Sequence, residues 1–315
     1  MKSVANVALD VDVAAKWRTR AKPLLGTRVE ISLPYFDEAN FLRSTDIAFE
    51  RVQTIHHAMS FHEVTSDVRA IARAAVGDIV TVSPDTWNTL LLAAEVERDS
   101  HGAFNVTVAP QLVARARLPA PDALTNPSTA TLLASSISFE PNNQIRVLQP
   151  VWIDLGGIAK GFAVDAAVVA LQDAGVTAGV VNAGGDLRVF GSARHTLALR
   201  IPATPTAIIE VAELQDLSCA TSGGYFSSDA HTSVSDHHPA IIGNRAQSMV
   251  NVASVSVIAS SCAVADALTK VVWLCGMDDS MCANLLARHS ARIVMLSPED
   301  LFQIAPEAIT IPPSS

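Results

Sequence analysis

The sequence predicts an α+β fold built as one large domain. The chain has 315 residues, which is enough for a sizeable hydrophobic core. Apolar residues make up 49% of the chain and charged residues 17%, a balance typical of a globular protein. Strand-like and helix-like segments follow one another without strict alternation, and no linker or repeat of fixed period separates them. We therefore expect a single domain of mixed sheets and packed helices.

The two ends of the chain are expected to lie outside this domain. Residues 1–19 contain no continuous apolar run, because Asp10 and Asp12 interrupt it, so no signal peptide is expected. We interpret residues 1–19 as a flexible tail, residues 20–308 as the domain and residues 309–315 as a second tail. This start of the chain favours a cytoplasmic location.

The first half of the chain shows three clear elements. Residues 28–33 alternate between apolar and polar side chains, which predicts a strand. Residues 37–57 carry an apolar stripe at helical spacing, which predicts an amphipathic helix. Ser83 and Pro84 suit the cap and first turn of a helix that continues to about residue 99. The remaining elements expected here are a turn and short helix within 59–75, a strand at 78–82, an extended segment at 104–108 and a helix around 129–135.

The second half is richer in strands. Pro141, Asn142 and Asn143 predict a hairpin turn between two short strands. A helix over 161–174 is expected to end at Gly175, since glycine readily adopts the left-handed conformation found at helix ends. The remaining expected elements are strands from 178 to 211, a mostly irregular polar stretch at 221–238, a strand at 252–259, and a helix from Cys262 capped by Ser260 or Ser261.

Charge and composition exclude several classes of protein. The net charge is −9, whereas binding to nucleic acid requires a basic surface. No run of about 18 uninterrupted apolar residues is present, so no membrane span is expected. The cysteines form no CxxC pair and have apolar neighbours, so buried thiols are expected at Cys219, Cys262, Cys275 and Cys282.

Two glycine-rich runs carry the main functional signal. IDLGGIAKGFAVD, at 153–165, places paired glycines and Lys160 directly before a helix, which suits a phosphate or pyrophosphate. The run is neither a Walker A loop nor GxGxxG, so a purely structural turn is an equal interpretation. VVNAGGDLRVFG, at 180–191, places a second glycine pair between two expected strands. Together the runs favour a ligand site without naming the ligand.

Three further groups of polar residues are candidates for chemistry. Asp266 lies in the last apolar helix, four residues before Lys270, so an ion pair and a magnesium ligand are both open interpretations. Ser222 lacks the GxSxG surroundings of a hydrolase nucleophile. A loop group of histidines and aspartates fits no strong zinc-ligand spacing. It comprises Asp229, His231, Asp236, His237 and His238.

Six motifs occur in order along the chain. They are PLLGT (23–27), GAFNVTVAP (102–110), IDLGGIAKGFAVD (153–165), VNAGGDLRVFG (181–191), ATSGGY (220–225) and SVSVIASSCAVADALTKVVWLCG (254–276). Each motif alone is modest, but the ordered set resembles the ApbE family of FAD:protein FMN transferases, over about residues 20–300.

The resemblance implies a single ApbE-like, T-fold-like domain that uses FAD as substrate together with Mg²⁺. Such an enzyme moves FMN from FAD onto a Thr or Ser hydroxyl of an acceptor protein and releases AMP, and the metal stabilises charge at phosphorus. The resemblance implies Asp266 and Lys160 as catalytic residues, and Gly157, Asp266 and Thr269 as metal ligands. The residues it implies for FAD contact are Leu25, His62, Ala103, Phe104, Asn105, Asp154 and Lys160.

The sequence departs from the family pattern around this expected site. Lys270 stands where the family has a metal-ligating threonine, and Thr269 lies about 100° away around the helix. Gly224 and Asn105 each replace an acidic residue, and the run HHPAIIGNRAQ (237–247) barely matches the family's H-x-I-D-P-x-T-G. These departures leave two alternatives open: a weakly active or non-catalytic flavin-binding relative, and an enzyme that hydrolyses FAD. Most family members are exported or lipid-anchored, unlike the location expected above.

Overall fold

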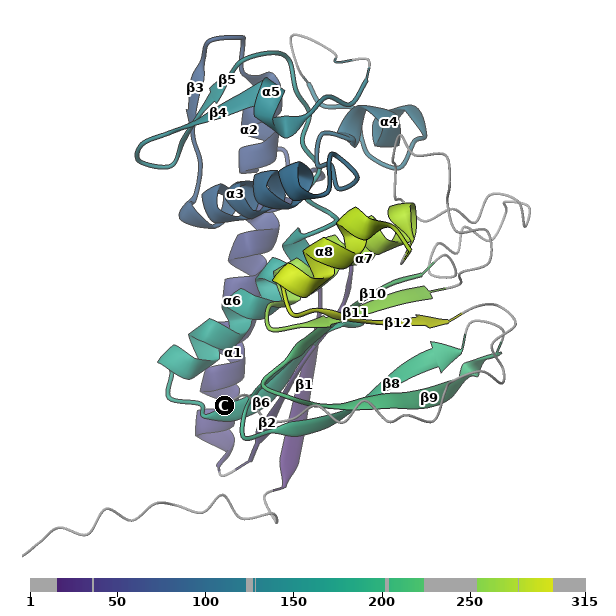
Figure 1. Cartoon of the computed structure of the whole chain (residues 1–315). Helices are drawn as coiled ribbons and strands as arrows, with labels where there is room; N and C mark the ends of the chain where they lie inside the picture. Colours follow the sequence, from purple (N-terminus) through teal and green to yellow (C-terminus); the bar gives the residue numbers. More distant parts are fainter. Residues whose placement is uncertain are drawn as a thin grey trace, which may run out of the picture.

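The structure is a computed structural model that describes residues 16–35, 37–122, 127, 129–201, 204–223, 254–276 and 278–296. Figure 1 shows the arrangement of its helices and strands. The strands are β1 (Trp17–Leu24), β2 (Thr27–Pro34), β3 (Ile79–Thr81), β4 (Ile137–Glu140), β5 (Gln144–Val147), β6 (Ala178–Ala183), β7 (Asp186–Gly191), β8 (Arg194–Ile201), β9 (Thr204–Gln215), β10 (Ser218–Gly223), β11 (Ser254–Ala259) and β12 (Arg292–Leu296). The helices are α1 (Glu38–Met59), α2 (Asp67–Arg73), α3 (Pro84–Asp99), α4 (Ala109–Ala114), α5 (Leu133–Ser136), α6 (Ala159–Asp173), α7 (Cys262–Cys275) and α8 (Ser280–Arg288).

The central element is a sheet with the strand order β1-β2-β6-β7-β10-β11-β12. Every neighbouring pair in it is antiparallel. Helices α1, α6 and α7 lie on one side of this sheet and the hairpin β8–β9 lies on the other (Figure 1). The small sheet β3-β5-β4 gathers with α2, α3 and α5 at one end of the molecule (Figure 1). The predicted fold class, an α+β single domain with mixed sheets and packed helices, is confirmed.

Apolar side chains fill both sides of the central sheet. Val164 and Val168 of α6 are fully buried in the main core, together with Ile31 of β2. On the opposite face, Val189 packs in a second cluster with Leu214 of the hairpin. Since successive strand residues point to opposite faces, the sheet buries apolar side chains in both directions. The result is a rigid central layer that fixes where the turns at its edges lie.

Several local predictions are confirmed. Asn142 and Asn143 both adopt positive φ, 62° and 57°, in the turn between β4 and β5. Gly175 has φ of 86° directly after α6, as expected for a glycine that ends a helix. Ser261 is the residue that caps α7, because its side chain accepts a hydrogen bond from the backbone N–H of Val264.

Other expectations were wrong in their detail. Residues 104–108 form a turn and not an extended segment, because the Asn105 side chain accepts hydrogen bonds from the Thr107 N–H (2.7 Å) and hydroxyl (2.9 Å). The helix expected around 129–135 is only Leu133–Ser136. Residues 221–223 belong to β10, which pairs with β11, whereas residues 224–238 lie outside the described residues.

Five elements were not predicted: β1, α4, β10, α8 and β12. β1 begins at Trp17, so the expected boundary at residue 19 falls inside a strand that pairs along its whole length with β2. Its sequence carries arginine and lysine rather than an apolar alternation, and the pairing partner rather than the local pattern makes it a strand. Cys219, Cys262 and Cys282 are buried as expected, but Cys275 is partly exposed.

Within the described residues, no helix combines the length and apolar character needed to cross a lipid bilayer.

Candidate functional site

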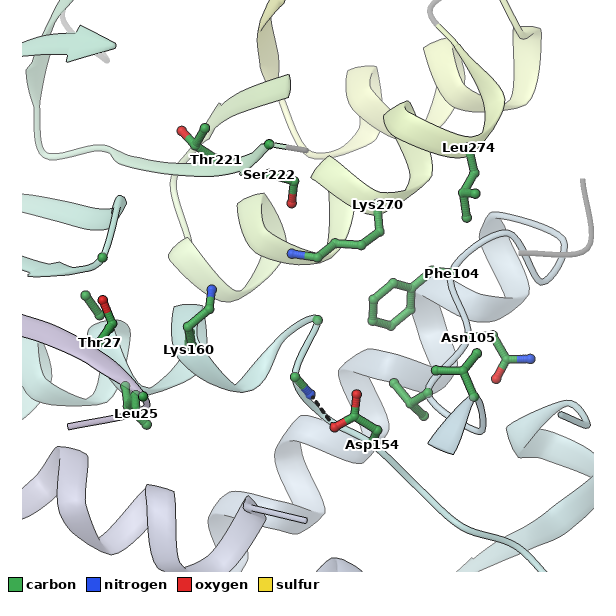
Figure 2. Close-up of a pocket in the computed structure, with 18 of the residues that line it drawn as sticks. Leu25, Thr27, Phe104, Asn105, Asp154, Lys160, Thr221, Ser222, Lys270 and Leu274 are labelled. Carbon is green, nitrogen blue, oxygen red and sulfur yellow. Dashed lines mark hydrogen bonds between the residues drawn. The ribbon is translucent and has the colours of Figure 1, made fainter. Parts of the chain in front are cut away.

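A cleft of about 490 Å³ lies where several turns meet at one end of the central sheet. Its walls come from the β1–β2 turn, the turn at 103–108, the glycine turn before α6, the glycine turn between β6 and β7, the end of β10, and α7. Figure 2 shows that Lys160 and Lys270 point toward each other across this space from α6 and α7. The two glycine runs and the last apolar helix therefore converge on one cavity of a size typical for ligand pockets.

The glycine turn joins α7 through a contact that only glycine permits. A Cβ atom on Gly161 would lie 2.3 Å from the backbone oxygen of Cys262. The N–H of Gly161 donates to a carboxylate oxygen of Asp266 at 3.2 Å. The absence of a side chain thus lets the first turn of α6 lie directly on α7.

Asp165, in the same glycine run, holds the start of α7. Its carboxylate accepts hydrogen bonds from the N–H groups of Cys262 and Ala263, both at 3.0 Å, and from the Ser261 hydroxyl at 2.8 Å. Arg188 of β7 donates to the same carboxylate at 2.7 Å. Two N–H groups that the helix itself leaves without partners are satisfied by a residue of α6. This anchor was missed in the sequence, where Asp165 looked like an ordinary polar residue of a helix.

Asp266 is fully buried and paired with two lysines. The Lys270 ammonium contacts one carboxylate oxygen, and the Lys160 ammonium lies 3.7 Å from the other. Burial by itself raises the pKa of Asp266, but the charges of Lys160 and Lys270 outweigh it and hold this pKa below its usual value. Asp266 is therefore an ionised carboxylate behind the cleft.

Lys160 also pairs with Asp186, a residue that sequence reasoning missed. Asp186 is only 1% exposed, and its other oxygen accepts from the backbone N–H of Thr221 at 3.2 Å. Burial lowers the pKa of Lys160, yet Asp186 and Asp266 more than reverse this effect, so its pKa is raised. Lys160 stays charged while its side chain keeps 34% of its surface exposed. The sequence feature that could have identified Asp186 as a site residue is its position directly after the second glycine pair.

Most residues expected to contact a flavin line the cleft. They are Leu25, Ala103, Phe104, Asn105, Asp154 and Lys160. His62 is not among the cleft-lining residues, although its charge acts to lower the pKa of Asp154. The Asn105 side chain is committed to its own turn, since its amide also donates to the Thr131 carbonyl at 2.7 Å.

Asp154 lies below the glycine turn and accepts a hydrogen bond from the Gly156 N–H at 3.2 Å (Figure 2). Burial raises the pKa of Asp154, and the Gly156 N–H and the charges of His62 and Lys270 only partly oppose this. The carboxyl therefore accepts a proton more readily than an exposed aspartate does.

Ser222 is tied to the helix rather than activated. Its hydroxyl lies 2.8 Å from that of Thr269, which in turn donates to the backbone oxygen of Asp266 at 2.7 Å. Among the described residues, no histidine or carboxylate that would act as a base contacts the Ser222 hydroxyl. Gly224 and the histidine–aspartate loop group lie outside the described residues.

The oxygen atoms expected to bind magnesium do not form an open site. Lys270 contacts both a carboxylate oxygen and, at 3.0 Å, the backbone oxygen of Asp266. Thr269 donates its hydroxyl proton to that same backbone oxygen, and the stem of Lys270 packs against Gly157. In the described part of the chain, no group of three or more His, Cys, Asp or Glu residues is arranged to hold a metal. The residues present therefore do not fit a Mg²⁺ ion, which needs oxygen ligands on several sides.

Comparison with known proteins identifies the family. A model of the ApbE family matches residues 25–294, which is most of the chain. The chain belongs to the ApbE family. The FAD:protein FMN transferase of Vibrio cholerae is 25% identical over 276 residues, covering 82% of this chain and 81% of that protein. The FAD:protein FMN transferase of Haemophilus influenzae is 24% identical over 283 residues, covering 82% and 80%.

Solved structures agree on the fold. The flavin transferase ApbE of Vibrio cholerae has a TM-score of 0.72 at 22% identity and covers 91% of this chain and 95% of its own. The ApbE protein of Thermotoga maritima has a TM-score of 0.69 at 24% identity, covering 90% and 94%. The expected family is confirmed, and with it the expected class of enzyme, a transferase.

Proposed function

We propose that this ApbE-family transferase is an FAD:protein FMN transferase. It binds FAD in the cleft, moves FMN onto a Thr or Ser hydroxyl of an acceptor protein, and releases AMP. The observation that carries this proposal is the convergence of both glycine turns with Lys160 and Lys270 on a single cavity. Two ammonium groups lie beside glycine turns whose backbone a ligand can approach closely, and this combination suits a diphosphate. The names of the relatives supply the identity of donor and product.

The cleft offers one wall for each part of the donor. Leu25, Ala103 and Phe104 present apolar surface for the flavin ring. Lys160 and Lys270 face the diphosphate, and the N-terminus of α6, which no side chain caps, points its positive dipole to the same place. Binding energy from the ring thus positions the reacting phosphorus between two cations.

The reaction needs one bond to form and one to break. The acceptor hydroxyl oxygen attacks the phosphorus of the FMN half, and the bond from that phosphorus to the bridging oxygen breaks. AMP leaves with the electron pair of that bond, and the hydroxyl proton is released. Charge builds on the phosphoryl oxygens during this displacement, where Lys160 and Lys270 stabilise it. No step in this scheme passes through a metal ion.

Covalent labelling tests the proposal. The purified chain is incubated with FAD and an acceptor domain that has one unmodified target Thr or Ser, and the acceptor mass and free AMP are measured. We expect one FMN added per AMP released. The control is the acceptor with Val or Ala at the target position, which should gain no mass. FAD binding without any mass gain would contradict the transfer.

Lys270 motivates a second candidate function. If the altered site binds FAD but does not bring an acceptor hydroxyl to the phosphorus, the chain is a flavin-binding protein. If water attacks in place of the acceptor hydroxyl, the chain hydrolyses FAD to FMN and AMP. Release of AMP in the absence of any acceptor protein favours hydrolysis. Retention of intact FAD under all conditions favours binding alone.

A further inference from the structure

The Lys270 ammonium lies against two oxygens of Asp266. It contacts a carboxylate oxygen and, at 3.0 Å, the backbone oxygen of the same residue, one helical turn away. Two oxygens of different kinds thus converge on one positive charge. An ammonium is a compact charge with three donors, so these two contacts leave a third N–H for a ligand.

The surroundings of Lys270 keep its ammonium in place. A Cβ on Gly157 would lie 3.6 Å from the Lys270 stem and 3.5 Å from the Phe104 ring, so the stem lies close against this glycine turn. Figure 2 shows the stem running past Phe104 toward the centre of the cleft. Only 16% of the side chain is exposed. Such a confined side chain loses little further freedom when a ligand arrives.

The charges are arranged in two layers. Asp266 and Asp186, at 0% and 1% exposure, lie behind the cleft, whereas Lys160 and Lys270 border it. The charges of the four groups sum to zero, but the two ammonium groups lie nearer to a ligand in the cleft than the two carboxylates do. Because the buried carboxylates hold both ammonium groups at the cleft, positive charge borders it without any added ion.

We propose that Lys270 is a built-in cation that takes the place of a divalent metal at Asp266, so that this chain binds and neutralises the FAD diphosphate without metal. This inference rests on the proposed function, because it concerns the same cleft. A covalently attached ammonium neutralises the diphosphate as a metal would, but a chelator cannot remove it. The Asp266 oxygens and the Thr269 hydroxyl, which a metal would need, already make hydrogen bonds within the protein.

FAD affinity with and without metal tests this inference. The whole chain is stripped with a chelator, and FAD binding is followed by quenching of flavin fluorescence, first without metal and then with Mg²⁺. We expect the dissociation constant of the native chain to change by less than about twofold on adding Mg²⁺. Its melting temperature, measured with Mg²⁺ alone, should not move.

Three variants sharpen the test. Lys270→Thr removes the cation and frees the oxygens, so FAD binding without metal should weaken by about tenfold or more and recover with Mg²⁺, which should also raise its melting temperature. Lys270→Met removes the cation and offers no ligand oxygen, so binding should weaken and Mg²⁺ should restore less of it. Lys16→Thr, at an exposed lysine directly before β1, is the matched control and should bind like the native chain.

The outcomes separate this inference from the proposed reaction. A gain in native FAD affinity of about tenfold or more with Mg²⁺ overturns the inference, as does native-like binding by Lys270→Met. If both Lys270 variants fail to fold, the metal response of the native chain decides alone. Metal-free FAD binding without transfer leaves the inference standing and removes the reaction, whereas transfer that requires Mg²⁺ removes the inference and leaves the reaction.

Discussion

The N–H of Gly161 donates to a carboxylate oxygen of Asp266 at 3.2 Å, across 105 positions of the chain. This bond joins the first turn of α6 to the buried charge of α7. The bond brings together two motifs that are far apart in sequence, because a backbone N–H of the glycine run is a hydrogen-bond partner of the carboxylate in the last apolar helix. The same closeness makes this junction sensitive to added volume.

Gly161→Ala should destabilise the chain strongly. The new methyl group would meet backbone atoms of Cys262 at 2.3 Å, which forces α6 and α7 apart and costs about 1–3 kcal/mol or more. Chemical denaturation measures the loss. Gly157→Ala is the control, since its Cβ meets only ordinary contacts at 3.5 and 3.6 Å, and it should lose much less stability. Equal losses in the two variants would contradict the tight junction.

Asp266→Asn should cost about 3–5 kcal/mol, because it leaves Lys160 and Lys270 close together without the buried charge that holds them. The unfolding free energy in urea gives the value. Replacing both partners, in Asp266→Asn with Lys270→Met, should recover part of the loss, since one of the uncompensated charges disappears. A double variant no more stable than Asp266→Asn would show that the charge pairing of Asp266 with Lys270 contributes less to stability than the packing of these side chains.

Asp165→Ala should weaken the start of α7 by about 2–4 kcal/mol, through the loss of two N–H partners and the contact with Arg188. Asp37→Ala, at the exposed cap of α1, removes a cap without a buried ion pair and should cost less. Amide hydrogen exchange should place the Asp165→Ala effect in the first turn of α7. Exchange rates there that match the native chain would rule out this anchoring role.

Asp154 should make the chain less stable as the pH rises from acid toward neutral. Burial raises its pKa in the folded state above the ordinary value of 3.8, so folded chains hold this proton where unfolded chains have lost it. This contribution to stability is therefore present below the unfolded pKa and is lost as the pH passes the folded pKa. Asp154→Asn keeps an acceptor for the Gly156 N–H and should raise the melting temperature at neutral pH by about 1–3 °C.

Melting curves of native and Asp154→Asn chains across the acid range provide the check. The two should approach each other at low pH, where the native carboxyl is protonated. A variant that melts lower than the native chain at neutral pH would mean that the ionised carboxylate is stabilising.

The site could be predicted in part because its backbone signals are local. The glycine pairs, Lys160 and Asp266 were visible as motifs, and their order along the chain pointed to one family. Asp186 and Asp165 were missed, since each gains its meaning from a partner on a distant element. The spacing of Asp266 and Lys270 allowed both an ion pair and a metal site, and the contacts of Lys270 favour the ion pair.

By itself, the sequence determined the caps, the turns and most helices of this protein, because a serine before a helix or an asparagine pair in a hairpin acts on its immediate neighbours. The tertiary structure alone decided that β1 is a strand, that the hairpin β8–β9 covers the far face of the sheet, and that two lysines and two aspartates share one buried cluster. Strand pairing and charge pairing join residues far apart in the chain, so their energies depend on which distant partner folding brings near.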